Sequence, residues 1–350
     1  MGASRPQTPE IPIFDGHNDA LTAPNHARLA TGGGDGHLDL PRMHAAGMRG
    51  GIFAVFVDSR EHHEYAEQFE IPYARPLPPR VRHSRAAGVT AVTVGQLLAL
   101  EREGAVRVAR SIADIDSAAT DGGPPVAVLH FEGAEAIDPR LESIETWYAA
   151  GLRSLGPVWS RPNAFAHGVP FAFPSSPDTG PGLTAAGKRL VRRCSELGIA
   201  IDLSHMNEAG FWDTARLDAG PLIVSHAGVH SLSPCSRNLT DAQIDAVAGS
   251  GGLIGIVFAC FFLRADFAND AHTTPLELII DHVRYVADRI GVEHVAFGSD
   301  FDGATIPAAL GDVMGYPKLL VALAEAGFTP AEIRRIAWDN WRRVLDAWWL

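Results

Sequence analysis

The sequence predicts an α/β protein folded as a (β/α)₈ TIM barrel, and three observations support this prediction. Short apolar runs alternate with amphipathic helical stretches along the chain, which is typical of parallel strands joined by crossover helices. About eight such runs occur, the number that a closed barrel needs. The chain has 350 residues, 46% of them hydrophobic, so it can bury a large core without disulfides. Length alone allows one large domain or two, and the strand count favours a single catalytic domain over residues 1–350.

The predicted strands are the apolar runs themselves. The longest apolar stretch, residues 251–263, contains three glycines. This stretch is shorter than the ~20 residues that a membrane-spanning helix needs, so we interpret it as a buried strand. The eight predicted strands cover residues 11–17, 51–58, 126–132, 152–159, 199–205, 222–226, 253–258 and 295–300.

Helical patterns fill most of the gaps between these runs. Residues 184–197 and 276–290 each combine an apolar stripe with a charged face, and a glycine follows each of them. We expect both helices on the outside of the barrel. Thr329 and Glu332 form a capping pattern around Pro330, which predicts a C-terminal helix over residues 329–349 that packs on the barrel. Residues 22–50 and 161–182 predict long loops over the C-terminal face of the barrel, where barrel active sites form.

Composition excludes several classes of function. Acidic residues exceed basic ones by 41 − 29 = 12, and no basic run is present, so a nucleic-acid partner is not expected. The N-terminal residues contain no apolar export segment, and no membrane association is expected. The three cysteines are widely spaced and form no CxxC pair, which favours neither a disulfide framework nor a thiolate metal site. A reducing cytoplasm is the predicted location.

Metal-binding side chains occur where predicted strands end. Because the C-terminal ends of all strands in a barrel meet on one face, residues distant in the sequence should converge there. A single histidine at a strand end is more often a hydrogen-bonded core or surface group. Five such strand ends in one chain, with carboxylates that are rarely buried without a partner, indicate a metal site instead. The residues are His17 and Asp19, Glu132, His205, His226 and Asp300.

The His-x-Asp pair formed by His17 and Asp19 illustrates the chemistry. Side chains two residues apart on an extended segment point to the same side, so both can reach one metal ion. Imidazole and carboxylate groups suit zinc, and manganese, cobalt and iron fit the same geometry. Glu132 can bridge to a second metal, which His205 and His226 would complete.

Six motifs, in their order and spacing, resemble the membrane dipeptidase (renal dipeptidase) family of zinc metallopeptidases, in particular its soluble, bacterial-type members. The motifs are IFDGHNDA, HFEGAEAI, IDLSH, VSHAG, SRNLTD and GSDFDG, and together they cover nearly the whole chain. The resemblance implies a barrel of the metallo-dependent hydrolase type with two zinc ions. It also implies a dipeptide substrate and, by analogy with the family, a homodimer.

The resemblance implies a role for each site residue. His17 and Asp19 would bind one zinc ion, His205 and His226 the other, and Glu132 would bridge them. The implied reaction is hydrolysis by a metal-bridging hydroxide, with Asp300 as the acid/base carboxylate and the oxyanion stabilised by zinc. Arg237 would grip the free carboxylate of a dipeptide, since a guanidinium offers paired donors. From the sequence alone, Arg237 could equally form a surface salt bridge.

The end of the fourth predicted strand departs from the family pattern. Trp159 stands where the family typically has a histidine that helps to hold the substrate carbonyl. The indole can donate a hydrogen bond but can neither accept a proton nor bind metal. Asn163 or His167, in the following loop, could supply a donor. Asp15 and Asp302 are predicted to be supporting groups that orient neighbouring residues.

Three functions compete on this reading. The leading one is a zinc-dependent dipeptidase, which the resemblance suggests could accept a D-residue at the C-terminal position. The Trp159 difference makes an amidase or lactamase for another small carboxylated amide a second candidate. The third is a metal-bound binding protein without turnover, and Asp300 argues against it because metal binding alone needs no acid/base carboxylate.

Overall fold

The computed structural model describes residues 11–24, 26–59, 70–120 and 123–349. Each of the eight predicted runs contains a parallel strand, which confirms the predicted βα alternation. The central strands are fully buried, as parallel strands covered by helices require. In chain order they are β1 (Ile13–Asn18), β2 (Met48–Phe56), β5 (Val126–Glu132), β6 (Leu152–Gly156), β8 (Ala200–Ile201), β9 (Ile223–Ala227), β10 (Leu253–Ile256) and β11 (Val295–Phe297).

These strands form a curled parallel sheet in two hydrogen-bonded parts. One part has the order β1-β2-β5-β6-β8, with the short β4 (Arg107–Val108) beside β5, and the other has the order β11-β10-β9. Isolated parallel bridges join the two parts on both sides, from Asp202 to Ile223 and from Asn18 to Phe301. The strands therefore follow one another around the curve in chain order, and their C-terminal ends lie at the same edge.

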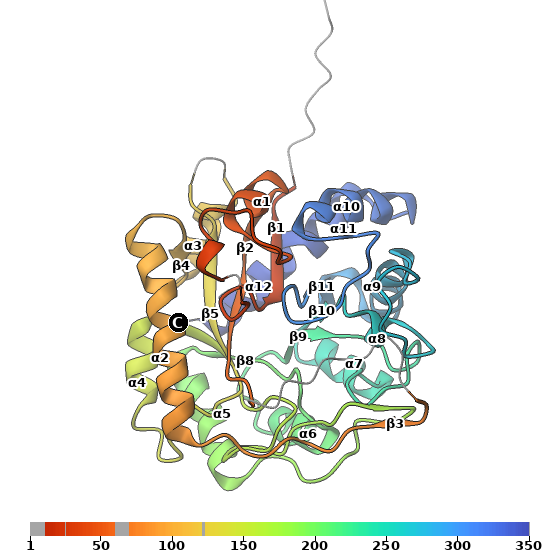
Figure 1. Ribbon diagram of the computed structural model, residues 1–350. Coiled ribbons are helices and arrows are strands. Elements are labelled where there is room, and N and C mark those ends of the chain that lie inside the picture. Colours follow the sequence, from red (N-terminus) through yellow and green to blue (C-terminus); the bar gives the residue numbers. More distant parts are fainter. Residues whose placement is uncertain (1–10, 25, 60–69, 121–122, 350) are drawn as a thin grey trace, which may run out of the picture.

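Helices surround this sheet (Figure 1). The predicted helix at 184–197 is confirmed as α5 (Ala185–Leu197): Thr184 caps its first turn, and Gly198 ends it with a left-handed φ of 69°. The predicted helix at 276–290 is confirmed as α9 (Glu277–Ile290). The other helices are α1 (Leu40–Ala45), α2 (His83–Arg102), α3 (Ile112–Ala118), α4 (Ile144–Ala150), α6 (Glu208–Ala215), α7 (Asp241–Gly249), α8 (Cys260–Leu263) and α10 (Tyr316–Glu325), with the 3₁₀ turns His26–Arg28, Val292–His294 and Val313–Gly315.

The C-terminal segment is helical as predicted, with an interruption that the sequence pattern did not indicate. The Thr329 hydroxyl accepts the Glu332 N–H in the predicted capping box of α11 (Pro330–Arg334). A π-helical turn (Arg335–Asp339) then leads into α12 (Asn340–Trp348). The indole N–H of Trp341 donates to the Phe297 carbonyl at 2.9 Å, which ties this helix to the end of β11.

The prediction of a loop over residues 22–50 was wrong in part. This segment contains α1, whose N-cap Asp39 accepts the Arg42 N–H, and Pro41 occupies the first turn. The preceding glycine-rich run obscured this start signal. Residues 161–182 contain only β7 (Ala172–Phe173), which pairs antiparallel with β3 (Tyr73–Ala74).

Two further predictions concern the cysteines and the membrane. Cys194, Cys235 and Cys260 are buried free thiols, as expected for core residues. Across the described ranges, no helix is both long and apolar enough to cross a lipid bilayer.

Candidate metal centre

The predicted ligands converge at the C-terminal ends of the strands. His17 lies on β1, and its Nε2 atom is 3.6 Å from Oδ2 of Asp19. Glu132 ends β5, and its Oε1 atom is 3.6 Å from Nε2 of His17. The same oxygen is 3.0 Å from Nε2 of His205, which follows β8, and 3.6 Å from Nε2 of His226 on β9. One carboxylate oxygen therefore faces three imidazole nitrogens supplied by three different parts of the sheet.

All five of these residues are buried, and the cluster strongly shifts the pKa values of four of them. Neither ring nitrogen of His17 has a hydrogen-bond partner. Burial opposes charge on His17, but Glu132 and Asp19 outweigh it and raise the pKa of His17 to about 10. Burial also raises the pKa of Glu132 well above its usual range. Burial, assisted by nearby positive groups, lowers the pKa values of His205 and His226 well below theirs, so both rings are neutral and offer lone pairs.

This donor set fits a divalent metal. In the described part of the chain, three groups of three residues place their ligand atoms within 4.8 Å of one another, and two of them consist of predicted site residues: His17, Glu132 and His226, and His17, Asp19 and Asp300. Neutral imidazoles and carboxylates are ligands that zinc accepts, and a dication would compensate buried carboxylates that share one site.

Asp300 lies beside this cluster in a constrained backbone. Its φ is 61°, in the left-handed region that non-glycine residues rarely adopt. Burial and the carboxylate of Asp19 raise its pKa to about 6, against the opposing charge of His17. A side chain at Gly303 would overlap the carboxylates of both Asp19 and Asp300, so this turn must lie directly on them. Asp300 is thus a half-buried carboxyl group whose pKa is close to that required of a group that accepts and returns a proton near neutral pH.

The residues predicted to support the site do hold its loops. Asp302 accepts the His37 N–H at 2.6 Å. Asp15 accepts both the backbone N–H and the hydroxyl of Ser299, at 2.8 and 2.7 Å. These bonds anchor the chain on both sides of Asp300.

Arg237 is buried, which excludes the alternative of a surface salt bridge. Its Nε–H donates a hydrogen bond to Nδ1 of His205 at 3.2 Å, and its Nη2 atom has no hydrogen-bond partner. No carboxylate pairs with it within the described residues. Arg237 therefore keeps a free, desolvated donor beside a predicted metal ligand.

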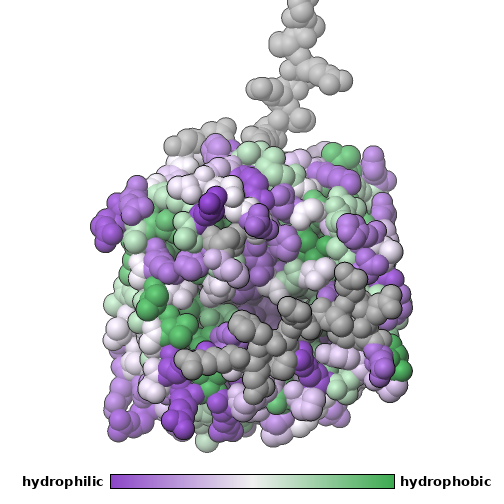
Figure 2. Space-filling view, in the orientation of Figure 1, coloured by the Kyte–Doolittle hydropathy of each residue, from purple (hydrophilic) through white to green (hydrophobic). Residues whose placement is uncertain are grey.

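A cavity of about 810 Å³ opens onto the cluster, and Figure 2 shows this face of the molecule hollowed near its centre. Asp19, Glu132, His205 and Asp300 are among its polar lining residues. Trp159 lies 5.7 Å from the His205 ring, between centroids. The remaining aromatic lining residues are Phe56, Phe171, Phe261 and Phe262.

The loop donors considered as replacements for the family histidine do not reach this cavity. The side-chain amide of Asn163 donates to the Pro157 carbonyl and accepts the Phe165 N–H, both at 2.8 Å. His167 packs against Gly180 instead. Among the residues that the structure describes, neither lines the cavity, and Trp159 does.

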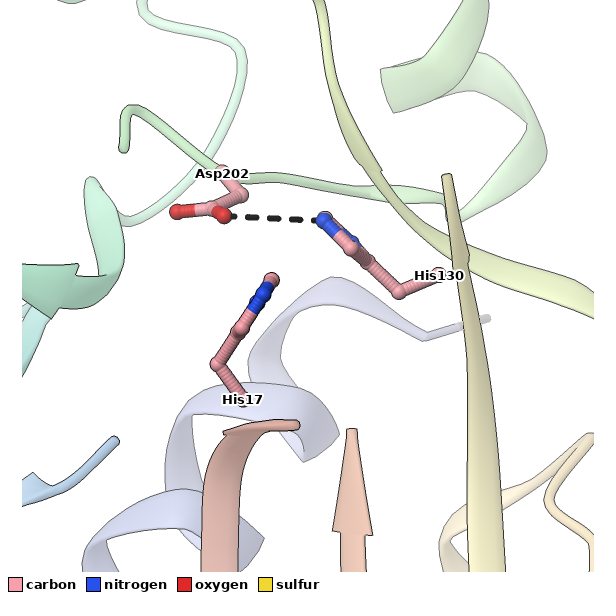
Figure 3. Close-up of side chains that lie close together, drawn as sticks. All are labelled: His17, His130 and Asp202. Atoms are coloured by element: carbon pink, nitrogen blue, oxygen red, sulfur yellow. Dashed lines mark ion pairs between the residues drawn. The ribbon is translucent and has the colours of Figure 1, made fainter. Parts of the chain in front are cut away.

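Two residues at the centre were missed from the sequence, His130 and Asp202. Figure 3 shows the His130 ring and the Asp202 carboxylate facing each other, with the His17 ring directed at the space between them. Their ligand atoms lie within 4.8 Å of those of His17, and Nε2 of His130 is 3.7 Å from Oδ2 of Asp202. The available signal was periodicity: His130 is two residues before Glu132 on β5, so both point to the same side. Asp202 stands in the IDLSH motif, where only the histidine was considered.

These features together define the class of protein. A curled parallel sheet carries, at the C-terminal ends of its strands, a buried carboxylate, several imidazoles, a second carboxyl group with a raised pKa and a cavity for a small molecule. This is the arrangement of a metal-dependent hydrolase.

Comparison with known proteins identifies the family. The family model described as membrane dipeptidase (peptidase family M19) matches residues 4–348. A Klebsiella pneumoniae protein described as an uncharacterized protein in the pqqA 5′ region is 46% identical over 246 residues, which cover 70% of this chain and 90% of that protein. The chain belongs to the membrane dipeptidase family and is a hydrolase of the metallo-dipeptidase class.

Solved structures agree with this assignment. The crystal structure of a dipeptidase of family M19 is 44% identical, with a TM-score of 0.90 over 97% of this chain and 99% of that one. A metallopeptidase from Rhodobacter sphaeroides, liganded with a phosphinate mimic of the dipeptide L-Ala-D-Ala, is also 44% identical. Its TM-score is 0.92 over 97% of this chain and 100% of that one.

Proposed function

We propose that this protein is a zinc-dependent dipeptidase that hydrolyses dipeptides with a free C-terminal carboxylate. The observation that carries the proposal is the contact of one Glu132 oxygen with three imidazole nitrogens beside a cavity. His17 and Asp19 would hold one ion, His205 and His226 the other, and Glu132 would bridge them. The liganded Rhodobacter sphaeroides relative supports a dipeptide-sized substrate.

The residues of this chain divide the reaction among them. When bound, a zinc pair supplies a nucleophilic hydroxide near neutral pH and polarises a carbonyl. Arg237 would bind the substrate carboxylate through its unpartnered Nη2 donor, which fixes the scissile bond over Glu132. Asp300, whose pKa is raised to about 6, would accept a proton during attack and return it to the departing amine. The aromatic walls would limit the access of water to the bound substrate.

A second candidate is an amidase or lactamase acting on another small carboxylated amide. Trp159 favours it, because this side chain lines the cavity beside His205 where the family typically has histidine. The aromatic wall would suit an apolar acyl group as well as an amino acid side chain.

Further proposals concern the whole chain. We propose that its eight parallel strands close into a (β/α)₈ barrel of the metallo-dependent hydrolase type, supported by single bridges on both sides of the sheet. We also propose that residues 1–350 form one catalytic domain. The hydrogen bond between α12 and the end of β11 supports this proposal. The three free thiols fit a reducing cytoplasm. A homodimer stays a prediction.

The test is a substrate panel on metal-free and zinc-reloaded protein. Ala-Ala dipeptides with L and D C-terminal residues, N-acyl amino acids and lactams would be compared at equal concentration. We expect hydrolysis of dipeptides only after zinc is restored. Cleavage of N-acyl amino acids or lactams without dipeptides would favour the second candidate. A zinc-loaded protein that cleaves none of them would contradict both candidates.

A further inference from the structure

We infer that Asp202 is a positioning residue, which fixes the proton of the His226 ring through the hydroxyl of Ser225. The consequence is that the ring nitrogen facing Glu132 keeps its lone pair for a metal. This inference rests on the proposed metal centre, but it concerns groups that lie behind the ligands. Asp202 belongs to the IDLSH motif, in which the proposed reaction gives a role only to His205.

The first step is the environment of the Asp202 carboxylate, which is 2% exposed. Its Oδ1 atom accepts the backbone N–H groups of Ser204 and Ser225, at 3.0 and 2.8 Å, and the Ser204 hydroxyl at 2.9 Å. Its Oδ2 atom accepts the Ser225 hydroxyl at 2.6 Å. An ionised carboxylate only accepts hydrogen bonds, so the single hydroxyl proton of Ser225 is directed at Asp202.

The second step follows from that direction. Oγ of Ser225 also lies 2.8 Å from Nδ1 of His226 and 3.1 Å from the hydroxyl of Ser204, whose own proton goes to Oδ1 of Asp202. Because its own proton is used, Oγ can act there only as an acceptor, and Nδ1 of His226 must carry the ring proton. In a neutral ring, Nε2 then has the lone pair, and Nε2 is the atom that faces Glu132 at 3.6 Å and His205 at 3.0 Å.

We call the hydrogen bonds from Asp202 through Ser225 to His226 the relay. Among the neighbouring histidines of the described chain, the relay reaches only His226. Nδ1 of His205 contacts the hydroxyl of Ser160 at 2.8 Å and Nε of Arg237 at 3.2 Å, with no carboxylate behind it among the described residues. His130, 3.7 Å from Asp202, makes its hydrogen bond to Ser154 instead. Asp202 should therefore act on metal binding at the His226 position.

The substitution Asp202→Asn is predicted to reverse the relay. The two backbone N–H groups require an oxygen at the Oδ1 position, so the new amide nitrogen must occupy the Oδ2 position and donate to Ser225. The Ser225 hydroxyl would then donate to Nδ1 of His226, which moves the ring proton to Nε2, the side that faces the metal. We expect metal affinity to fall about 10- to 100-fold, measured by competition with a chelator.

A second substitution separates this effect from general damage. Adding Ser225→Ala to Asp202→Asn removes the misdirected hydroxyl, so metal affinity should recover part of the loss, whereas two unrelated structural losses would add. Asp138→Asn is the matched control. Asp138 accepts the backbone N–H and hydroxyl of Ser143, at 2.8 and 2.9 Å, and its carboxylate contacts no imidazole among the residues that the structure describes. Its variant should keep the affinity of the parent protein.

The direct measurement is ¹⁵N NMR of histidine-labelled, metal-free protein, with His226 signals assigned from a His226→Asn variant. We expect Nδ1 to carry the proton in the parent protein and Nε2 to carry it after Asp202→Asn. An Nε2 proton in the parent protein would overturn the inference, even if the variant fails to fold. So would a folded variant with unchanged tautomer and affinity. A parent protein that binds no metal would instead overturn the proposed function.

Discussion

Two buried glutamates at the end of β5 have opposite surroundings. Glu135 accepts two hydrogen bonds from Arg161, from Nε at 3.2 Å and from Nη2 at 2.9 Å, and the guanidinium is fully buried. Glu132, three residues earlier and equally buried, faces only imidazoles within ion-pair distance among the described residues. A carboxylate with a fixed guanidinium partner is costly to disturb, because removing one partner leaves the other charge buried, whereas one surrounded by imidazole nitrogens has the surroundings of a metal ligand.

The largest expected effect is that of Glu132→Gln. Removing the shared carboxylate should reduce metal content and lower dipeptide hydrolysis by roughly 10⁴-fold, because both ions lose a ligand. Elemental analysis and kcat/KM would be measured on the same sample. A variant with full metal content and activity would show that Glu132 is no bridge.

Asp300→Asn should leave the metals in place and remove the proton carrier. We expect kcat to fall about 10²- to 10⁴-fold with little change in metal content. The pair of measurements separates a chemical role from a ligand role. Loss of metal together with activity would assign Asp300 to the ligand set.

Glu135→Gln should lower the stability of the fold, whereas Glu132→Gln should lower its metal content. The change leaves Arg161 buried without its charge partner, and the free energy of unfolding should fall by about 3–5 kcal/mol. Urea denaturation would measure it, and the folded fraction should still bind metal. An unchanged unfolding free energy would refute the cost of breaking this pair.

Arg237→Lys tests the substrate anchor. A lysine keeps the charge but loses the paired donors, so kcat/KM for dipeptides should fall about 10- to 100-fold, mainly through KM. Lysine at the matched buried position Arg161 serves as the control for lost packing. Equal kcat/KM values for the Arg237→Lys variant and the parent protein would remove Arg237 from the substrate site.

The smallest effect concerns pH. In metal-free protein the pKa of His17 is about 10, so this ring holds a proton at neutral pH that a metal must displace. Metal affinity should therefore rise with pH, by about tenfold per unit for this one proton, and level off above pH 10. Chelator competition between pH 6 and 8 would measure the slope. Metal affinity that falls as pH rises would contradict the raised pKa of His17.

The parallel strands and the convergence of the candidate site residues were predictable because both depend on local patterns. Apolar runs identify buried parallel strands, and the position of His17 or Glu132 at the end of such a run gives its place on the C-terminal face. Sequence periodicity carries no information about which strand ends meet across the sheet. The contacts of Asp202 with Ser225 and of His130 with Ser154 depend on that meeting, so they appear only in the structure.

Local signals also explain the other differences. The π-helical turn before α12 has no sequence signature as clear as the capping box at Thr329. The burial of Arg237 depends on packing against Phe262, whose ring centroid lies 5.7 Å from the guanidinium carbon, and a sequence spacing cannot indicate such a contact.

The central claim is that Glu132 and its surrounding imidazoles hold a pair of metal ions. Zinc titration of metal-free protein, followed by elemental analysis after gel filtration, tests it most directly. The account predicts about two zinc ions per parent chain, a clear loss in Glu132→Gln and full retention in folded Glu135→Gln. Parent protein that emerges without zinc, or zinc retained equally by both glutamate variants, would contradict the account.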